Sequence, residues 1–256
     1  MPTAVVTGAS RGLGRGIAVA LAEAGFDVVI GWCRSEVDAK DTATVVEATG
    51  RAAVLVGGDV TDPTTHRGLA AAAVAELGGL DVWVNNAGVS MLAPVVDTST
   101  DDLRRMLETN VIGVHLGMKE AVGRFRSAGR GGRIVNVASE LGVQAFPFLG
   151  AYAASKFAVV GLTQAAAIEL ASEGITVNAV GPGTAETDMV MAERASESAL
   201  TGRSQEEVRA AYLGGVPTGR FCTPADVGAL VAYLASPAAS YVTGQTICIN
   251  GGSVLH

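Results

Sequence analysis

Short apolar segments alternate along this chain with longer segments whose apolar residues recur at helical spacing. The apolar segments predict β-strands at residues 3–7, 28–32, 53–57, 81–84, 132–139, 175–180 and 246–249. The periodic segments predict helices at residues 12–24, 35–49, 152–171 and 224–234, a helix that begins at 63, and two helices between about 100 and 127. Strands separated by helices are typical of βαβ units. The pattern therefore predicts an α/β fold with a doubly wound parallel sheet and helices on both faces.

Residues 184–219 interrupt this alternation. The segment is rich in Met, Glu and Ser and predicts only short helices. Connections of this length are uncommon inside a compact domain unless they carry a function, so we expect a lid or substrate loop here. Because we find no linker, repeat or low-complexity segment, residues 1–256 are predicted to form a single domain.

The composition narrows the function classes. With 49% hydrophobic and only 17% charged residues, the chain is able to build a large core and does not belong to the disordered class. A formal net charge of -7 without a block of lysine or arginine disfavours nucleic-acid binding. No apolar run reaches the ~18 residues of a membrane helix. Since the first residues enter a strand without a leader segment, we expect a cytoplasmic protein that does not bind membranes.

Cysteine and histidine give no sign of a metal site. The three cysteines lie far apart without CxxC spacing, which is typical of small apolar residues in a reducing compartment. His66, His115 and His256 have no sequence neighbours that would form a metal site or a catalytic triad. We therefore expect them to be structural or to face solvent.

Ser139, Tyr152 and Lys156 form the strongest candidate for catalysis. Ser139 ends a buried β-branched strand, and Tyr152 and Lys156 lie four residues apart in a helical segment, so that their side chains share a face. A phenol ordinarily holds its proton until pH ~10, and we expect the neighbouring ammonium to lower the pKa of Tyr152 toward working pH. A serine hydroxyl beside the phenol would hold a carbonyl oxygen. Together the three residues suit protonation of a ketone or deprotonation of an alcohol.

A glycine-rich loop joins the first strand to the first helix, with the sequence Thr7-Gly8-Ala9-Ser10-Arg11-Gly12-Leu13-Gly14. Its spacing is GxxxGxG, which differs from the GxGxxG of many dinucleotide folds. The physical basis is shared, because the glycines permit a tight turn and close backbone approach, and the helix N-terminus favours a pyrophosphate.

This loop, Ser139 and the Tyr152-Ala153-Ala154-Ser155-Lys156 segment together resemble the short-chain dehydrogenase/reductase family, and the resemblance extends from Thr3 to Gly252. It implies a Rossmann fold and a catalytic tetrad of Asn110, Ser139, Tyr152 and Lys156. In such a tetrad the backbone of the asparagine holds a water that relays protons.

The resemblance also implies a set of nucleotide contacts. In chain order these are Gly8, Ser10, Arg11, Gly12, Leu13 and Gly14 at the pyrophosphate loop, Asp59 and Val60 at the adenine, Asn86, Ala87 and Gly88 beside the adenosine ribose, Tyr152 and Lys156 at the nicotinamide ribose, and Pro182, Gly183 and Thr187 along the nicotinamide.

The end of the second strand bears on which cofactor binds. An NAD site usually carries an acid there for the ribose 2′-hydroxyl, whereas this strand ends in Trp32-Cys33-Arg34-Ser35. Arg34 and Ser35 are placed to hold a 2′-phosphate, with Arg11 within reach, and arginine suits phosphate through its charged planar fork. We predict NADP(H), with NAD(H) as the alternative.

The leading interpretation is an NADPH-dependent carbonyl reductase similar to 3-oxoacyl-carrier-protein reductases, although their carrier docking usually uses basic surface, which is sparse here. The alternative is an NAD-dependent diol, acetoin or sugar-alcohol dehydrogenase of the same family. A remote alternative is a non-catalytic nucleotide-binding module. Glu140 either faces solvent or biases the pocket toward a polar or cationic substrate. Apolar residues on more than one side of helices 110–127 and 152–171, and the frequent tetramers of the family, predict a homotetramer or a dimer.

Overall fold

The computed structural model of the chain describes residues 1–255, so His256 lies outside the described residues. Seven strands form one sheet: β1 (Thr3–Val6), β2 (Asp27–Trp32), β3 (Ala53–Gly57), β4 (Val82–Asn85), β5 (Gly132–Val137), β6 (Ile175–Pro182) and β7 (Thr246–Ile249). Their order is β3-β2-β1-β4-β5-β6-β7, and every neighbouring pair is parallel. The predicted doubly wound parallel sheet is confirmed.

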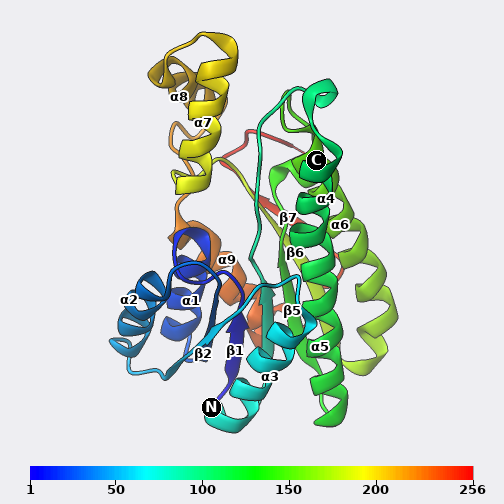
Figure 1. The fold of residues 1–256 in the computed structure, drawn as a ribbon. Coiled ribbons are helices and arrows are strands. Elements are labelled where there is room, and N and C mark those ends of the chain that lie inside the picture. Colours follow the sequence, from blue (N-terminus) through cyan, green and yellow to red (C-terminus); the bar gives the residue numbers. More distant parts are fainter. Residues whose placement is uncertain (256) are drawn as a thin grey trace.

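Helices cover both faces of this sheet (Figure 1). Their bounds are α1 (Gly12–Glu23), α2 (Glu36–Glu47), α3 (Pro63–Leu77), α4 (Thr100–Leu107), α5 (Gly113–Ser127), α6 (Gly150–Leu170), α7 (Asp188–Thr201), α8 (Gln205–Gly214) and α9 (Pro224–Ala235). Buried side chains of α1, α2 and α9 form one core cluster, and those of α3, α5 and α6 form the other.

Alternation along the strands explains the two clusters. Successive side chains of a strand point to opposite faces, so Ala4 and Val6 of β1 join the first cluster while Val5 joins the second. All three are fully buried. A strand that is buried on both faces has an almost continuous apolar sequence, and such segments therefore predicted the strands of this sheet.

The sheet changes direction of winding between β1 and β4. From β1 the chain proceeds outward through β2 and β3, then returns to β4 and proceeds outward on the other side. Loops that follow β1 and β4 therefore diverge at their carboxyl ends and leave a crevice, the usual ligand position in open α/β sheets.

The helix that begins at Thr100 continues to Ser127 with one irregularity. A π-helical turn at Glu108–Ile112 joins α4 to α5, where two helices were predicted. Single π turns inside α-helices occur frequently at functional sites. This turn contains Asn110, whose side chain is fully buried.

Residues 184–219 contain α7 and α8, which stand away from the sheet at the crevice side (Figure 1, yellow). No residue of α7 is buried, and Val208 is the buried residue of α8. Side chains cap both helices, since Thr187 accepts a hydrogen bond from the Val190 N–H and Ser204 forms a capping box with Glu207. We call residues 184–219 the lid. No helix within residues 1–255 is both long and apolar enough to cross a membrane.

Candidate active site

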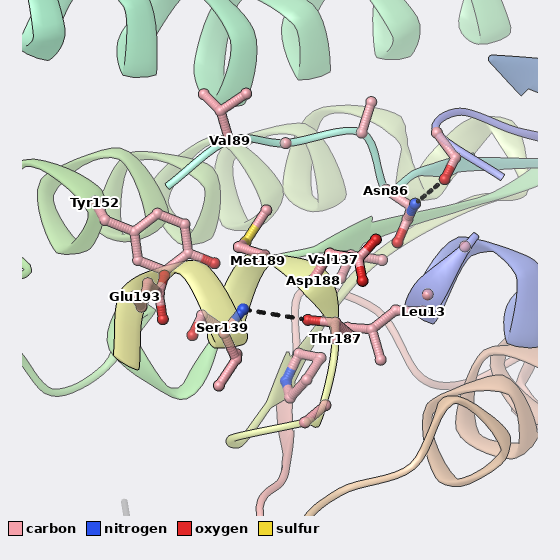
Figure 2. A pocket seen from close by; sticks show the side chains of 18 of the residues that line it. Leu13, Asn86, Val89, Val137, Ser139, Tyr152, Thr187, Asp188, Met189 and Glu193 are labelled. Atoms are coloured by element: carbon pink, nitrogen blue, oxygen red, sulfur yellow. Dashed lines mark hydrogen bonds between the residues drawn. The ribbon is translucent and has the colours of Figure 1, made fainter. Parts of the chain in front are cut away.

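One large cavity lies at the carboxyl ends of the strands, with a volume of about 930 Å³. Its wall combines the glycine-rich loop, the segment after β4, the end of β5, the first turns of α6 and the lid. Figure 2 shows Ser139, Tyr152 and three residues of the lid, Thr187, Asp188 and Glu193, around this space. The cavity therefore joins the predicted cofactor loop to the predicted catalytic residues.

The structure brings Ser139, Tyr152 and Lys156 together. Tyr152 and Lys156 lie one turn apart in α6, and the Lys156 Nζ is 5.5 Å from the centre of the Tyr152 ring. Lys156 is buried and donates a 2.9 Å hydrogen bond to the carbonyl oxygen of Val137 at the end of β5. The Ser139 hydroxyl accepts from the Leu141 N–H at 3.1 Å, which fixes its position two residues beyond that strand.

Burial dominates the proton affinities of this pair. Desolvation raises the pKa of Tyr152 above its ordinary 10.0, the negative charge of Glu193 adds to the rise, and the Ser139 hydroxyl opposes it. Desolvation likewise lowers the pKa of Lys156 to about 8. The expectation that the pKa of Tyr152 is lowered toward working pH is therefore wrong. The neutral phenol that results is the form that donates a proton to a carbonyl oxygen.

Asn110 does not line the cavity but supports its wall. Its side chain binds the backbone of Val89, and its Nδ2 also donates to the Ser155 hydroxyl at 3.0 Å. Ser155 in turn donates to the carbonyl oxygen of Tyr152 at 2.7 Å. These bonds connect the π turn to the segment after β4 and to the first turn of α6.

Two glycines of the loop are required by close backbone approach. Gly8 has φ of +64°, and a Cβ there would lie 2.8 Å from the Ala87 Cα. A Cβ on Gly14 would lie 2.2 Å from the carbonyl oxygen of Gly8. Only glycine adopts such a turn without strain. Both glycines also line the cavity at the start of α1, and this arrangement fits a dinucleotide pyrophosphate.

Thr7 and Asn86 hold this loop to the segment after β4. The Thr7 hydroxyl accepts from the N–H groups of Asn86 and Ala87 at 3.0 and 3.1 Å. The Asn86 side-chain amide donates to the carbonyl oxygens of Thr7 and Gly8 at 2.9 and 3.0 Å (Figure 2). The Asn86 side chain is thus engaged with the loop, although the residue also borders the cavity.

The other predicted cofactor residues border the same cavity with one exception. Those that line it are Ser10, Arg11, Gly12, Leu13, Arg34, Asp59, Val60, Ala87, Gly88, Pro182, Gly183 and Thr187. Ser35 is instead the N-cap of α2, where its hydroxyl accepts from the Asp38 N–H at 3.2 Å.

The two arginines predicted to attract a 2′-phosphate differ in their surroundings. Arg34 is exposed at the cavity and makes no ion pair within residues 1–255. Arg11 instead forms an ion pair with Asp188, the first residue of α7. This pair joins the glycine-rich loop to the lid, so that the charge of Arg11 is already partly compensated.

Glu140 is buried, and the expectation that it faces solvent is wrong. Its side chain is 5% exposed, accepts a hydrogen bond from the Ser253 hydroxyl and also faces Asn250. Burial raises the pKa of this carboxyl. Glu140 thus ties the residue after Ser139 to the segment that follows β7.

Sequence reasoning missed three residues of the site. Ser155 carried no signal beyond its place inside the YxxxK segment, and Phe148 lines the cavity with an uncommon φ of +65°. Glu193 projects from α7 toward Tyr152 (Figure 2). The sequence shows that the lid is rich in acids, but it does not show which of these acids faces the cavity.

Comparisons with known proteins find similarity over almost the whole chain. A family model described as enoyl-(acyl carrier protein) reductase matches residues 8–254. L-2,3-butanediol dehydrogenase of Corynebacterium glutamicum is 42% identical, with 97% of each chain covered. The 3-oxoacyl-[acyl-carrier-protein] reductase of Vibrio cholerae is 39% identical over 97% of this chain and 96% of its own. The crystal structure of a variant of actinorhodin polyketide ketoreductase with NADPH superposes with a TM-score of 0.93 at 37% identity, covering 98% of this chain and 97% of that one.

Proposed function

This chain belongs to the short-chain dehydrogenase/reductase family and is an oxidoreductase of alcohols or ketones, and we propose that it reduces a small polar ketone with NADPH and oxidises the corresponding secondary alcohol with NADP⁺. The gathering of Ser139, Tyr152 and Lys156 in the cavity that contains the glycine-rich loop carries the proposed reaction.

Each residue of the site has its own role in the proposed reaction. In reduction, Tyr152 donates its phenolic proton to the carbonyl oxygen, and the Ser139 hydroxyl donates a hydrogen bond to the same oxygen. In oxidation, the Tyr152 phenolate accepts the proton of the alcohol. Lys156 supplies positive charge beneath the phenol and restores its proton, while Asn110 keeps the first turn of α6 in place.

A bound nicotinamide cofactor supplies or accepts the hydride at the carbonyl carbon. Its pyrophosphate would lie on the loop backbone at the N-terminus of α1, with Asp59 and Val60 beside the adenine. Tyr152 and Lys156 would hold the nicotinamide ribose, and Pro182, Gly183 and Thr187 would border the nicotinamide ring.

Arg34 supports the choice of NADP(H). β2 ends at Trp32 and is followed by Cys33, so no acid at this end of the strand repels a 2′-phosphate, and the exposed guanidinium of Arg34 is free to bind it. The pairing of Arg11 with Asp188 leaves Arg34 as the principal candidate for this contact.

The charge of the lid carries the substrate assignment. Within the described chain, the lid residues that line the cavity include four acids and no lysine or arginine; the acids are Glu186, Asp188, Glu193 and Glu197. Three of these acids are paired with arginines, whereas Glu193 has no such partner within residues 1–255 and leaves a negative charge in the wall. This charge disfavours a substrate that brings phosphate or an acidic carrier protein. It favours a small polar ketone without negative charge, and the relative in Corynebacterium glutamicum is named for a small polar diol.

The second candidate is reduction of a 3-oxoacyl thioester. Its support is the similarity to the 3-oxoacyl reductase and to the polyketide ketoreductase. Purified enzyme should be assayed with acetoin, diacetyl, 2,3-butanediol and acetoacetyl-coenzyme A, each with both cofactors. We expect the highest kcat/KM for a four-carbon substrate with NADP(H). A higher kcat/KM for the thioester would establish the second candidate instead.

The proposal includes assembly into a homotetramer or dimer. Phe157 and Ile168 of α6 are 45% and 82% exposed, although both are large apolar residues. Apolar side chains exposed along the outer side of one long helix are suited to burial against a second subunit.

A further inference from the structure

Glu193 places a carboxylate at the substrate end of the cavity. It belongs to α7 of the lid and lines the same cavity as Ser139 and Tyr152. Its side chain points toward Tyr152 (Figure 2). Its charge is felt at the phenol, because it raises the pKa of Tyr152. A substrate whose carbonyl oxygen contacts Ser139 and Tyr152 therefore also approaches Glu193.

Among the four lid acids that line the cavity, Glu193 is the one that has no partner of opposite charge within residues 1–255. The other three acids of the lid wall are paired: Asp188 with Arg11, Glu186 with Arg194 and Arg209, and Glu197 with Arg203 and the Tyr212 hydroxyl.

Ser90, in the segment after β4, lies next to this carboxylate. Its hydroxyl is buried outside the lining of the cavity and faces Glu193 closely enough to lower the pKa of that carboxyl. Burial has the larger effect and raises the pKa of Glu193. A half-buried carboxylate that lacks a cation gains from a ligand that brings a donor.

Resting on the proposed function, we propose that Glu193 forms a subsite for a hydrogen-bond donor carried on the carbon next to the reacting one. The substrate class is then a vicinal hydroxy ketone and its diol, or the corresponding amino ketone and amino alcohol. Both donors present an N–H or O–H to the carboxylate, and the bond is charge-assisted in each case. Plain ketones and alcohols of the same size lack this contact.

The test compares three alcohols with one carbon skeleton: 2-butanol, 2,3-butanediol and 3-amino-2-butanol. Values of kcat/KM are measured with NADP⁺ for wild type, Glu193→Gln and the control Glu206→Gln. Glu206 is an exposed acid of α8, so the control makes the same charge change elsewhere in the lid. In wild type we expect the diol or the amino alcohol to exceed 2-butanol by tenfold or more. Glu193→Gln should reduce that ratio about tenfold, and Glu206→Gln should leave it within twofold.

The outcomes separate this inference from the function on which it rests. If Glu193→Gln reduces kcat/KM of the diol relative to 2-butanol, the donor is a hydroxyl. If it reduces kcat/KM of the amino alcohol relative to 2-butanol, the donor is an ammonium. Either result supports the subsite. If Glu193→Gln lowers kcat/KM equally for all three substrates, or leaves it unchanged for all three, the subsite is refuted while the dehydrogenase function stands. If wild type oxidises none of the three and reduces acetoacetyl-coenzyme A instead, the proposed substrate class fails as well.

Discussion

Asn110 makes two 2.8 Å hydrogen bonds to the backbone of Val89, accepting from its N–H through Oδ1 and donating to its carbonyl oxygen through Nδ2. The amide thereby pairs with Val89 as a neighbouring strand would, and it holds the wall of the cavity after β4 has ended. Gly88 allows this approach, since a Cβ there would lie 3.2 Å from the Asn110 Oδ1.

Replacing Asn110 with alanine should destabilise the fold and reduce turnover together. The change leaves the N–H and carbonyl of Val89 without partners, at a cost of about 1–3 kcal/mol in the free energy of unfolding. Urea unfolding of Asn110→Ala and of the control Glu108→Gln measures this cost. Glu108 is exposed in the same π turn, so the control should remain within about 0.5 kcal/mol of wild type. Equal stability of the two variants would contradict the role assigned to Asn110.

Tyr152→Phe should nearly abolish turnover in both directions while cofactor binding stays within a few-fold of wild type. The phenol is the group that exchanges a proton with the substrate oxygen, and the ring that packs in the wall is retained. Steady-state kinetics and titration of cofactor fluorescence give the two quantities. Substantial activity in a folded variant would remove Tyr152 from its proposed role.

Cofactor preference should depend on the residues after β2. We expect wild type to bind NADPH more tightly than NADH by on the order of a hundredfold, since each ~1.4 kcal/mol is a factor of ten. Arg34→Ala should remove most of this preference, and Arg11→Ala should remove less because Arg11 is already paired with Asp188. Trp32→Asp should reverse the preference by adding an acceptor for the ribose hydroxyl. Fluorescence titration with both reduced cofactors decides the matter, and tighter binding of NADH to wild type would overturn the assignment.

Stability should rise with pH through the titration of Lys156. Burial lowers its pKa from 10.5 to about 8, so between these values the unfolded chain binds more protons than the folded chain. The free energy of unfolding therefore increases as pH rises through this window, by up to on the order of 3 kcal/mol. Urea unfolding between pH 7.5 and 10 should show this slope in wild type and not in Lys156→Met. Parallel slopes would mean that the ammonium is not destabilised by burial.

Sedimentation velocity at micromolar concentration should show a tetramer or dimer. Ile168→Glu should shift the distribution toward monomer, because it places a charge on the exposed apolar side of α6. Glu169→Gln, an exposed neighbour on the same helix, is the matched control. A wild-type chain that sediments only as a monomer would exclude the proposed assembly.

The sequence predicted those parts of the site that depend on local spacing. Apolar runs identified the strands, and the four-residue interval between Tyr152 and Lys156 placed both side chains on one face of α6. Glycines in a strand-to-helix loop identified the cofactor end, because close approach of Gly8 to Ala87 leaves no room for a side chain.

Features that depend on distant partners could not be predicted. The ion pair between Arg11 and Asp188 joins positions 177 residues apart, and it changes the expected role of Arg11. Glu193 stands out only because the neighbouring acids have arginine partners. The pKa of Tyr152 rises because the phenol is buried and faces Glu193, and both are properties of the assembled fold.

The shallow packing of the lid has a consequence for how this protein can change over evolutionary time. Since no residue of α7 is buried, substitutions along its length remove little apolar contact from either core cluster. New substrate preferences can therefore arise in the lid at little expense in folding stability. The strands beneath carry the opposite constraint, because Val5 and its neighbours are enclosed on both faces of the sheet. Substitutions should therefore accumulate in the lid, while the strands and the catalytic residues at their ends change little.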